Sequence, residues 1–336
     1  MNGFKRIPLL VAAVLLVAVF VLNLRAPPAA EDADAPSAAK VSYDAFAPLP
    51  STPDLPAAKV ALGERLFSDP RLSRDDSISC ASCHDLATGG VDGRKVSLGV
   101  GGAPGGVNAP TVFNVGFAFA QFWDGRAATL EEQAAGPIHN PVEMASDWPQ
   151  VLAKLGADDD YRTAFAALYP DGIAAANVAD AIATFERSLV TPDSPFDRHL
   201  RGEAGALTPL ADRGYRRFRE LGCASCHQGV LLGGNMFQKF GVLRDYFASR
   251  PATQADLGRY NVTGREEDRH VFKVPSLRNV ALTAPYFHDA SASTLEAAVV
   301  VMARHQLGRE LSDDDVDALV AFLRSLTGTY RGKPLE

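Results

Sequence analysis

The sequence has no cysteine outside two short motifs. Its four cysteines lie within residues 80–83 and 223–226, so none is left for a structural disulfide. No basic run occurs and the formal net charge is -7, so the sequence lacks the electrostatic signature of a nucleic-acid-binding protein. It also lacks sustained alternation of apolar and polar residues, which excludes a protein built mainly of half-buried strands. We therefore expect a mainly α-helical protein whose cysteines do not serve as cross-links.

The N-terminus is a targeting segment. Lys5 and Arg6 precede an uncharged apolar stretch over residues 7–24, which is long for a signal-peptide core and reaches the length of a membrane span. An Ala-x-Ala cleavage candidate at residues 33–35 is followed by Pro36, which disfavours cleavage. The pattern favours a retained membrane anchor over a cleaved signal peptide. Either reading places the remaining chain outside the cytoplasm, and we expect it in the periplasm.

The rest of the chain divides into a linker and two helical domains. Residues 25–55 are rich in Ala and Pro and predict an extended tether. Residues 56–200 and 201–336 each contain one cysteine motif, and the last helix is a candidate for packing on the first domain. Apolar periodicity and capping signals predict helices over residues 56–67, from Thr129, over 178–190, from Thr208, from Ser293 through Met302, and from Ser312 to near Gly328.

Both cysteine motifs read Cys-x-x-Cys-His, at residues 80–84 and 223–227. Two thiols three residues apart on a helical turn can each add to one haem vinyl group, and the adjacent His coordinates the iron. A zinc site would need a closed tetrahedral ligand set, and a thioredoxin-like redox pair would need no His after it. Two copies in an exported chain favour two covalently attached haem c groups. The thioether residues would be Cys80, Cys83, Cys223 and Cys226, with His84 and His227 as proximal ligands.

A methionine is the usual second ligand of an electron-transfer haem c. Besides Met1, the chain has Met144, Met236 and Met302. Met302 follows the second motif on a predicted helix, where a sixth ligand would be expected. A Met on an apolar helical face is as often a core residue. The residues alone therefore leave both ligation and packing open for Met302.

From about residue 62 to 326 the chain resembles the bacterial di-haem cytochrome c peroxidases. The resemblance rests on residues 63–72, 80–93, 108–114, 121–126, 136–144, 275–289 and 306–308. It implies a peroxide-reducing haem in the N-terminal domain and a His/Met-ligated haem in the C-terminal domain. The second haem would receive electrons from a small cytochrome c or copper protein.

The resemblance also implies roles for single residues. Met302 becomes the sixth ligand of the second haem, Trp123 an electron conduit between the haems, and Glu143 the acid–base group for peroxide, although packing alone could explain Trp123 and Glu143. A calcium site would take oxygen ligands, which are Asn108, Thr283 and Pro285 at the matching positions. Direct and structural roles remain equally open for Gln133, Pro137, Arg126 and His288.

One departure concerns the distal side of the first haem. Many members of the family carry a His sixteen residues after the first proximal His, on a mobile loop, and this His caps the iron until the enzyme is activated. Here that position is Val100, in a Gly-rich stretch over residues 99–106 that we expect to be mobile. Valine cannot ligate iron, so we expect an open site in the oxidised protein. His139 and His288 are the candidates for a replacement ligand.

These observations predict an oxidoreductase that reduces hydrogen peroxide. Two rival functions remain. A di-haem electron carrier would have both irons six-coordinate. A relative of the di-haem enzymes that oxidise tryptophans of a partner protein would carry Tyr in place of Met302. The sequence leaves a homodimer open.

Overall fold

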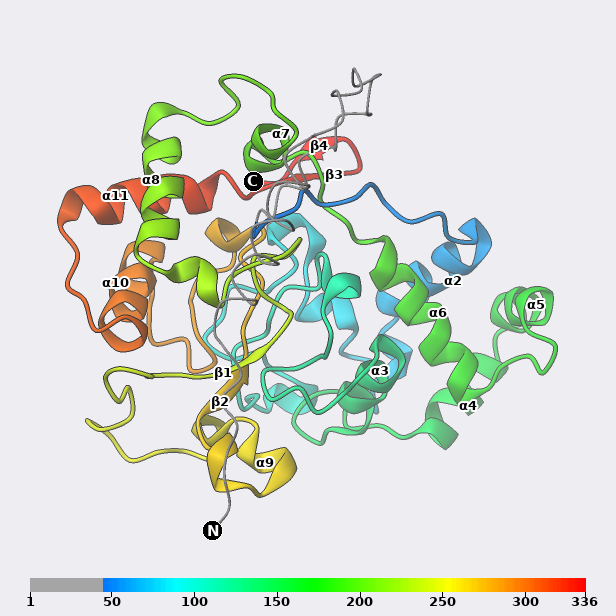
Figure 1. Ribbon diagram of the computed structural model, residues 1–336. Helices are drawn as coiled ribbons and strands as arrows, with labels where there is room; N and C mark the ends of the chain where they lie inside the picture. Colours follow the sequence, from blue (N-terminus) through cyan, green and yellow to red (C-terminus); the bar gives the residue numbers. More distant parts are fainter. Residues whose placement is uncertain (1–44) are drawn as a thin grey trace, which may run out of the picture. The chain divides into compact units, whose positions relative to one another are not determined.

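The computed structural model describes residues 45–336, which are mainly helical (Figure 1). The α-helices are α2 (Ala57–Phe67), α3 (Leu130–His139), α4 (Trp148–Gly156), α5 (Asp159–Leu168), α6 (Ala175–Ser188), α7 (Pro195–Leu200), α8 (Pro209–Glu220), α9 (Tyr260–Thr263), α10 (Leu295–Gln306) and α11 (Asp313–Arg324). Two small antiparallel sheets pair β1 (Phe237–Lys239) with β2 (Val271–Lys273) and β3 (Thr329–Tyr330) with β4 (Lys333–Pro334). The prediction of a mainly α protein is confirmed.

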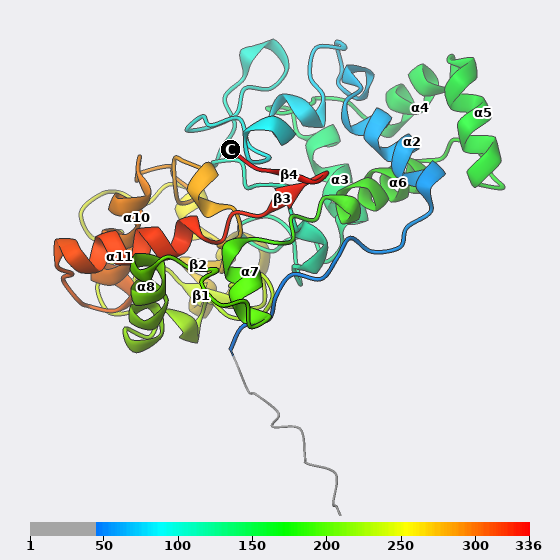
Figure 2. The same cartoon turned by 90° about the horizontal axis from the view of Figure 1, so that it is seen from above.

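Each half of the described chain is built on one close pair of helices. In the first half α2 packs on α6, and in the second half α8 packs on α11 (Figures 1 and 2). A glycine permits each approach, because a Cβ at Gly63 would overlap the carbonyl oxygen of Ala181, and one at Gly214 would overlap that of Ala318. The two halves therefore repeat one arrangement, in which the first helix leads towards a cysteine motif and the last helix closes the half.

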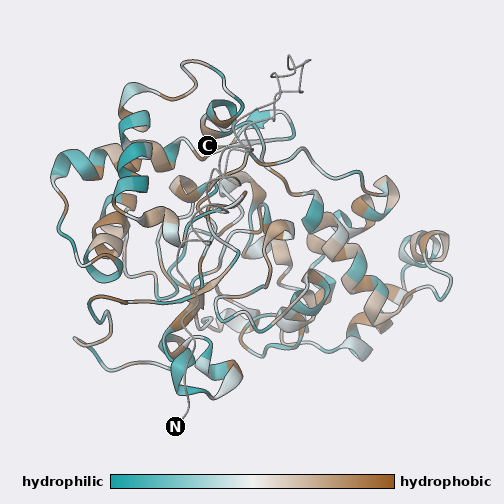
Figure 3. Cartoon of the chain, viewed as in Figure 1, coloured by the Kyte–Doolittle hydropathy of each residue, from teal (hydrophilic) through white to brown (hydrophobic). Residues whose placement is uncertain are grey.

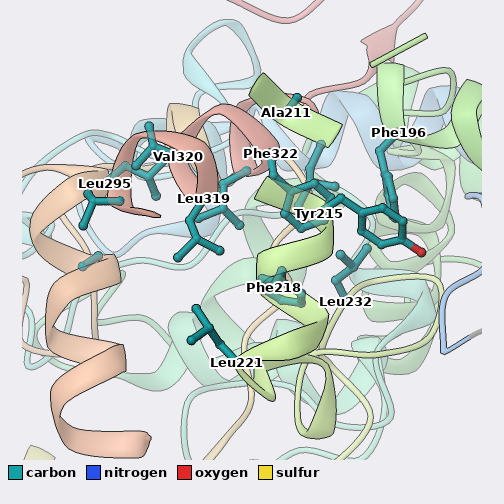
Figure 4. Close-up of a cluster of buried hydrophobic side chains, with 14 of the residues drawn as sticks. Phe196, Ala211, Tyr215, Phe218, Leu221, Leu232, Leu295, Leu319, Val320 and Phe322 are labelled. Atoms are coloured by element: carbon teal, nitrogen blue, oxygen red, sulfur yellow. The ribbon is translucent and has the colours of Figure 1, made fainter. Parts of the chain in front are cut away.

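Aromatic side chains fill the core between these helices. In the second half Phe218 and Tyr215 of α8 pack against Phe322 of α11, with ring centroids 5.1 and 5.5 Å apart (Figure 4). In the first half Phe67 of α2 meets Phe185 of α6 at 5.3 Å. Hydrophilic and hydrophobic residues alternate around α8 (Figure 3), as expected for a helix with one buried face, whereas α6 is buried on all sides over residues 181–186.

The N-cap residues in the sequence correctly predicted where three of the helices begin. The Thr129, Thr208 and Ser312 side chains accept hydrogen bonds from backbone N–H groups in the first turns of α3, α8 and α11. The expected cap at Ser293 is displaced by one residue, since Thr294 accepts from the N–H of Ala297. The helix α7 was not expected. It begins where Ser194 and Asp197 cap each other, between the helices predicted over residues 178–190 and from Thr208.

The end of the predicted linker is not free. Phe46 and Leu49 are buried, and Phe46 forms a bridge with Gly229, just after the second cysteine motif. The Leu49 N–H donates to Asp197, which forms a fully buried ion pair with Arg278 at 2.8 Å. Apolar side chains therefore fix this part of the linker to the second half.

Residues 7–24, where we predicted a membrane anchor, lie outside the described residues. Within residues 45–336, no helix is long and apolar enough to cross a membrane.

The chain end, rather than the last helix, reaches the first half. The helix α11 packs mainly against α8 and α10. Beyond it, the Tyr330 ring contacts Phe113 at 5.1 Å, and Arg331 forms an ion pair with Glu64 of α2 at 2.7 Å. The residues that follow the last helix therefore contact the first half, and packing of the last helix itself on the first domain stays a prediction.

Candidate functional site

Both cysteine motifs adopt the same tight turn. The carbonyl of Cys80 accepts hydrogen bonds from the N–H groups of Cys83 and His84, at 3.2 and 3.0 Å. In the second motif the carbonyl of Cys223 accepts from Cys226 and His227, at 3.3 and 3.1 Å. The turns are the 3₁₀ helices Cys80–Ser82 and Cys223–Ser225. This local geometry brings the two thiols and the imidazole of each motif together, and all four cysteines are unpaired.

Each motif histidine is oriented through one ring nitrogen. His84 Nδ1 lies 3.3 Å from the carbonyl oxygen of Gly90, and His227 Nδ1 lies 3.0 Å from that of Leu232. A backbone carbonyl on Nδ1 fixes the tautomer and leaves Nε2 as the ligating atom. Burial lowers the pKa of both histidines, which favours the neutral imidazole that binds metals.

The thiols do not have the character of a redox pair. Burial raises the pKa of Cys80 to about 12 and that of Cys223 to about 11. Reactive Cys-x-x-Cys pairs and zinc sites instead depend on a stabilised thiolate. Neutral thiols at Cys80 and Cys223 fit covalent attachment to a haem better than either alternative.

A largely apolar cavity lies beside the second motif. It is lined by Cys223, Cys226 and His227 from the motif and by Met302 from α10. The structure therefore places the predicted sixth ligand in the same cavity as its partner histidine. The residues fit a haem c group, since thiols, imidazole and thioether converge on an apolar space.

Lys273 was missed in the sequence analysis. It lines the same cavity, and burial lowers its pKa to about 8, against the opposing charge of Asp124. A cation in an apolar cavity suits the anionic propionates of haem. Only the fold brings this lysine, 46 residues after the motif histidine His227, into the cavity.

Trp123 also lines this cavity. Its Nε1–H donates to the carbonyl of Asn108 at 2.9 Å, and its own carbonyl accepts from the N–H of Lys273 at 2.8 Å. One hydrogen bond thus fixes the indole and the other fixes the backbone of Trp123. A fixed aromatic ring at this place is compatible with both packing and electron transfer.

Glu143 lies at the first motif. The carboxylate accepts a hydrogen bond at Oε1 from Asn140 Nδ2, at 2.7 Å. Its charge contributes to the raised pKa of both Cys80 and Cys83. Burial raises the pKa of Glu143 itself, opposed by the bond from Asn140 and the charge of Arg126. The site therefore contains a carboxyl group with a raised pKa next to the first haem motif.

The loop that contains Val100 contacts the backbone of Glu143. The Val100 N–H donates to the carbonyl of Glu143 at 2.8 Å, and a Cβ at Gly99 would overlap the same carbonyl. Val100 is buried, whereas Gly101 and Gly102 are exposed with φ of 67° and 77°. A side chain without a metal-binding atom therefore occupies the position of the family's capping histidine.

The two spare histidines have other partners. His139 is exposed, and its Nδ1 lies 2.7 Å from the carbonyl of Ala135 in its own helix. His288 is buried, and its Nε2 lies 2.7 Å from Asp256 Oδ1. Neither geometry supports a replacement ligand for the first haem.

His288 belongs to a buried network that the sequence analysis missed. Burial opposes the ionisation of Asp256, but hydrogen bonds from Arg250, Thr253 and His288 outweigh it and hold the pKa of Asp256 well below its usual range. Arg250 also pairs with Asp289 at 2.8 Å. The His288 ring lies edge-on to Trp123, with centroids 6.3 Å apart. The network therefore holds the His288 ring in place next to Trp123 in the lining of this cavity.

The predicted calcium ligands line one cavity. Asn108, Thr283 and Pro285 line the cavity of the second motif. Asn108 Nδ2 donates to the carbonyl of Arg94 at 2.9 Å, which leaves Oδ1 as its ligating atom. The donor set, an amide oxygen with backbone carbonyls, is of the kind that calcium prefers.

The other residues of the matching segments have structural contacts. Arg126 pairs with Asp124 at 3.0 Å and stacks on Phe122, with its guanidinium 3.5 Å from the ring centroid. Gln133 and Pro137 lie in α3, and the carbonyl of Pro137 accepts from the N–H of Met144 at 3.1 Å. These contacts shape the segment that leads to Glu143.

Comparison with known proteins identifies both halves. The family model for di-haem cytochrome c peroxidase matches residues 57–205, and that for cytochrome c matches residues 211–327. The chain is 55% identical over 284 residues to the cytochrome c peroxidase Ccp of Escherichia coli (strain K12), covering 84% of this chain and 61% of that protein. It is 49% identical to the cytochrome c551 peroxidase of Nitrosomonas europaea, covering 80% of this chain and 79% of that protein.

A solved structure has the same fold. It is a MauG-like protein associated with microbial copper homeostasis, with a TM-score of 0.76 and 31% identity, covering 87% of this chain and 96% of that one. The similarity thus extends over both halves described above.

Proposed function

The chain belongs to the di-haem cytochrome c peroxidase family, and we propose that it reduces hydrogen peroxide to water with electrons from a small cytochrome c or copper protein. The chain spans 61% of the length of the Escherichia coli relative, so the activity is inferred from its own residues as well as from the family. The proposal depends mainly on one observation, which is that different side chains lie beside the two motifs. Glu143 lies at the first motif, while the thioether of Met302 shares a cavity with His227.

The two motifs would hold one haem c each. His84 would bind the iron of the first haem, and His227 and Met302 would bind that of the second. When bound, haem supplies the redox-active iron at which peroxide is reduced. Lys273 neutralises anionic charge in the second cavity. Asn108, Thr283 and Pro285 would hold a calcium ion near Trp123.

Glu143 carries the proton chemistry. Asn140 holds Oε1, which leaves Oε2 to take a proton from one peroxide oxygen and return it to the other. The leaving oxygen then departs as water. The carboxyl group must be ionised to begin this transfer, and the charge of Arg126 favours that form. Together, two electrons and two protons convert one peroxide into two waters.

Trp123 provides the path for electrons. Its ring lies against the cavity of the second motif, and the hydrogen bond to Asn108 holds it in place. Electrons would enter at the haem of His227 and Met302 and leave through this indole. The Met302 position counts against the enzymes that oxidise tryptophans of a partner, because these carry Tyr there.

We further propose a periplasmic location, with residues 7–24 as a membrane tether. We also propose two domains, a peroxidatic domain over residues 56–200 and an electron-transfer domain over residues 201–336. A homodimer remains open to measurement by light scattering.

Steady-state turnover tests the function. The holoprotein is mixed with a reduced small cytochrome c or copper protein, and donor oxidation is followed as peroxide is added. The proposal predicts peroxide-dependent oxidation of two donors per peroxide. A chain that exchanges electrons with the donor but shows no dependence on peroxide would be an electron carrier instead.

A further inference from the structure

A buried carboxyl group at the first haem motif has no role in the mechanism above. Within residues 45–336, two buried side-chain oxygens lack a hydrogen-bond partner, Ser97 Oγ and Glu186 Oε2. The charge of Glu186 raises the pKa of Cys80, so this carboxyl group lies near the first motif. Buried polar groups are almost always paired, so an orphaned carboxyl oxygen needs an explanation.

The repeat between the two halves shows where Glu186 points. Ala181 and Phe185 of α6 correspond to Ala318 and Phe322 of α11, because each pair meets a glycine and a phenylalanine of the partner helix in the same way. The correspondence extends to Ser188 and Ser325, whose hydroxyls donate at 2.6 Å to the carbonyls of Phe185 and Phe322. The residue after each phenylalanine is Glu186 in α6 and Leu323 in α11.

Leu323 lines the cavity that contains His227 and Met302. Glu186 therefore occupies, in the first half, the place of a residue that faces the haem cavity in the second half. The first pocket has a carboxyl group where the electron-transfer pocket has an aliphatic side chain. Glu186 is only 5% exposed, so its carboxyl group is largely removed from solvent.

We infer that Glu186 is a positioning residue that couples reduction of the first haem to proton uptake. In the oxidised protein its carboxylate balances the positive charge of the ferric iron. When one electron arrives from the second haem, this charge is lost, and Glu186 Oε2 binds one proton from solvent. One electron and one proton enter together, so the net charge of the buried pocket does not change.

The surroundings favour such a proton change. Burial raises the pKa of Glu186 to about 8, opposed by the charge of Arg187 and assisted by that of Glu131. Arg187 is itself paired with Glu131 of α3 at 2.6 Å. The short segment Val115–Phe117, which also contacts α6, carries no charge.

The remaining charges near α6 are paired elsewhere. From α2, Lys59 pairs with Asp180 at 2.7 Å, and Glu64 pairs with Arg331 at 2.7 Å. Cys80 does not titrate once it forms a thioether. Two carboxyl groups therefore act on Cys80, and Glu143 is the one held by a hydrogen bond from Asn140. Glu186 is the one whose buried Oε2 has no partner among the described residues.

The inference rests on the proposed haem at His84, and potentiometry at several pH values tests it. In wild-type holoprotein the midpoint potential of the first haem should fall as pH rises near neutrality, by up to about 59 mV per pH unit for one proton per electron. Glu186→Gln and Glu186→Leu should largely abolish this slope and raise the potential above neutral pH. Leucine is the residue found at the corresponding position of the second pocket.

Two comparisons sharpen the test. Glu131→Gln removes a nearby carboxylate outside the pocket and should keep the slope, and the second haem should be unaffected in every variant. Infrared difference spectra of the wild type should show a protonated carboxyl band that appears on reduction.

A wild-type potential independent of pH, an unchanged slope in variants that retain both haems, or absence of the infrared band would each overturn the inference. Peroxide turnover that persists in these cases would leave the proposed function intact. A protein without haem at Cys80 and Cys83 would instead refute the proposed function.

Discussion

Replacing Glu143 by glutamine should abolish most of the peroxide turnover while preserving both haem spectra. Gln keeps the size of the side chain, and its amide oxygen can still accept the hydrogen bond from Asn140 Nδ2. It cannot take up and return a proton. General acid–base groups contribute roughly 10²–10⁴-fold, which corresponds to about 3–5 kcal/mol of transition-state stabilisation.

The pH profile adds a second measure. Burial raises the pKa of Glu143 above its ordinary value of 4.5, so the ionised form needed for catalysis is lost as pH falls through this raised pKa. Turnover should therefore decrease on the acid side at a pH above 4.5. Asn140→Ala removes a hydrogen bond that favours the carboxylate, and it should move this acid limb to higher pH.

Steady-state donor oxidation at several pH values is the assay. Glu132→Gln, at an exposed carboxylate of the preceding helix α3, is the matched control and should keep wild-type turnover. Near wild-type turnover in Glu143→Gln would remove this residue from the mechanism. An acid limb that does not move in Asn140→Ala would show that another group controls it.

Three further predictions concern the haems and the fold. Met302→His should lower the potential of the second haem and slow electron entry, because a thioether favours ferrous iron more than imidazole does; an unchanged spectrum and potential would place the ligand elsewhere. The oxidised protein should show a substantial high-spin ferric signal in electron paramagnetic resonance, because Val100 cannot ligate iron; two low-spin signals would reveal another cap. Gly214→Ala should lower the free energy of unfolding by about 1–3 kcal/mol in denaturant titration, because the new Cβ meets the Ala318 carbonyl. Gly156→Ala, whose Cβ meets nothing within 4 Å, is the control, and equal effects of the two would contradict the packing argument.

Local signals in the sequence were sufficient for several features. The Cys-x-x-Cys-His spacing predicts the turn that gathers two thiols and an imidazole, because only the intervening backbone is involved. The caps at Thr129, Thr208 and Ser312 were equally readable, since a cap needs only the residues of one helical turn. The placement of Met302 with His227 required the family resemblance.

Features that depend on distant contacts were missed. The pairing of Arg250 and His288 with Asp256 joins segments that no sequence pattern links. The docking of Phe46 beside Gly229 likewise depends on the folded second half, so a segment with the composition of a linker was expected to be free. Nothing in the local sequence distinguishes Lys273 and Glu186 from other charged residues. Only the fold shows that Lys273 lines the cavity of the second motif and that Glu186 is buried near Cys80.

One single-turnover measurement tests the central claim most directly. The holoprotein, with both haems reduced and no donor present, is mixed in a stopped-flow instrument with one equivalent of hydrogen peroxide. Two haems hold the two electrons that one peroxide requires, so the account predicts that both become oxidised after a single equivalent. Haem spectra that do not change on mixing, or oxidation that needs two equivalents of peroxide, would contradict it.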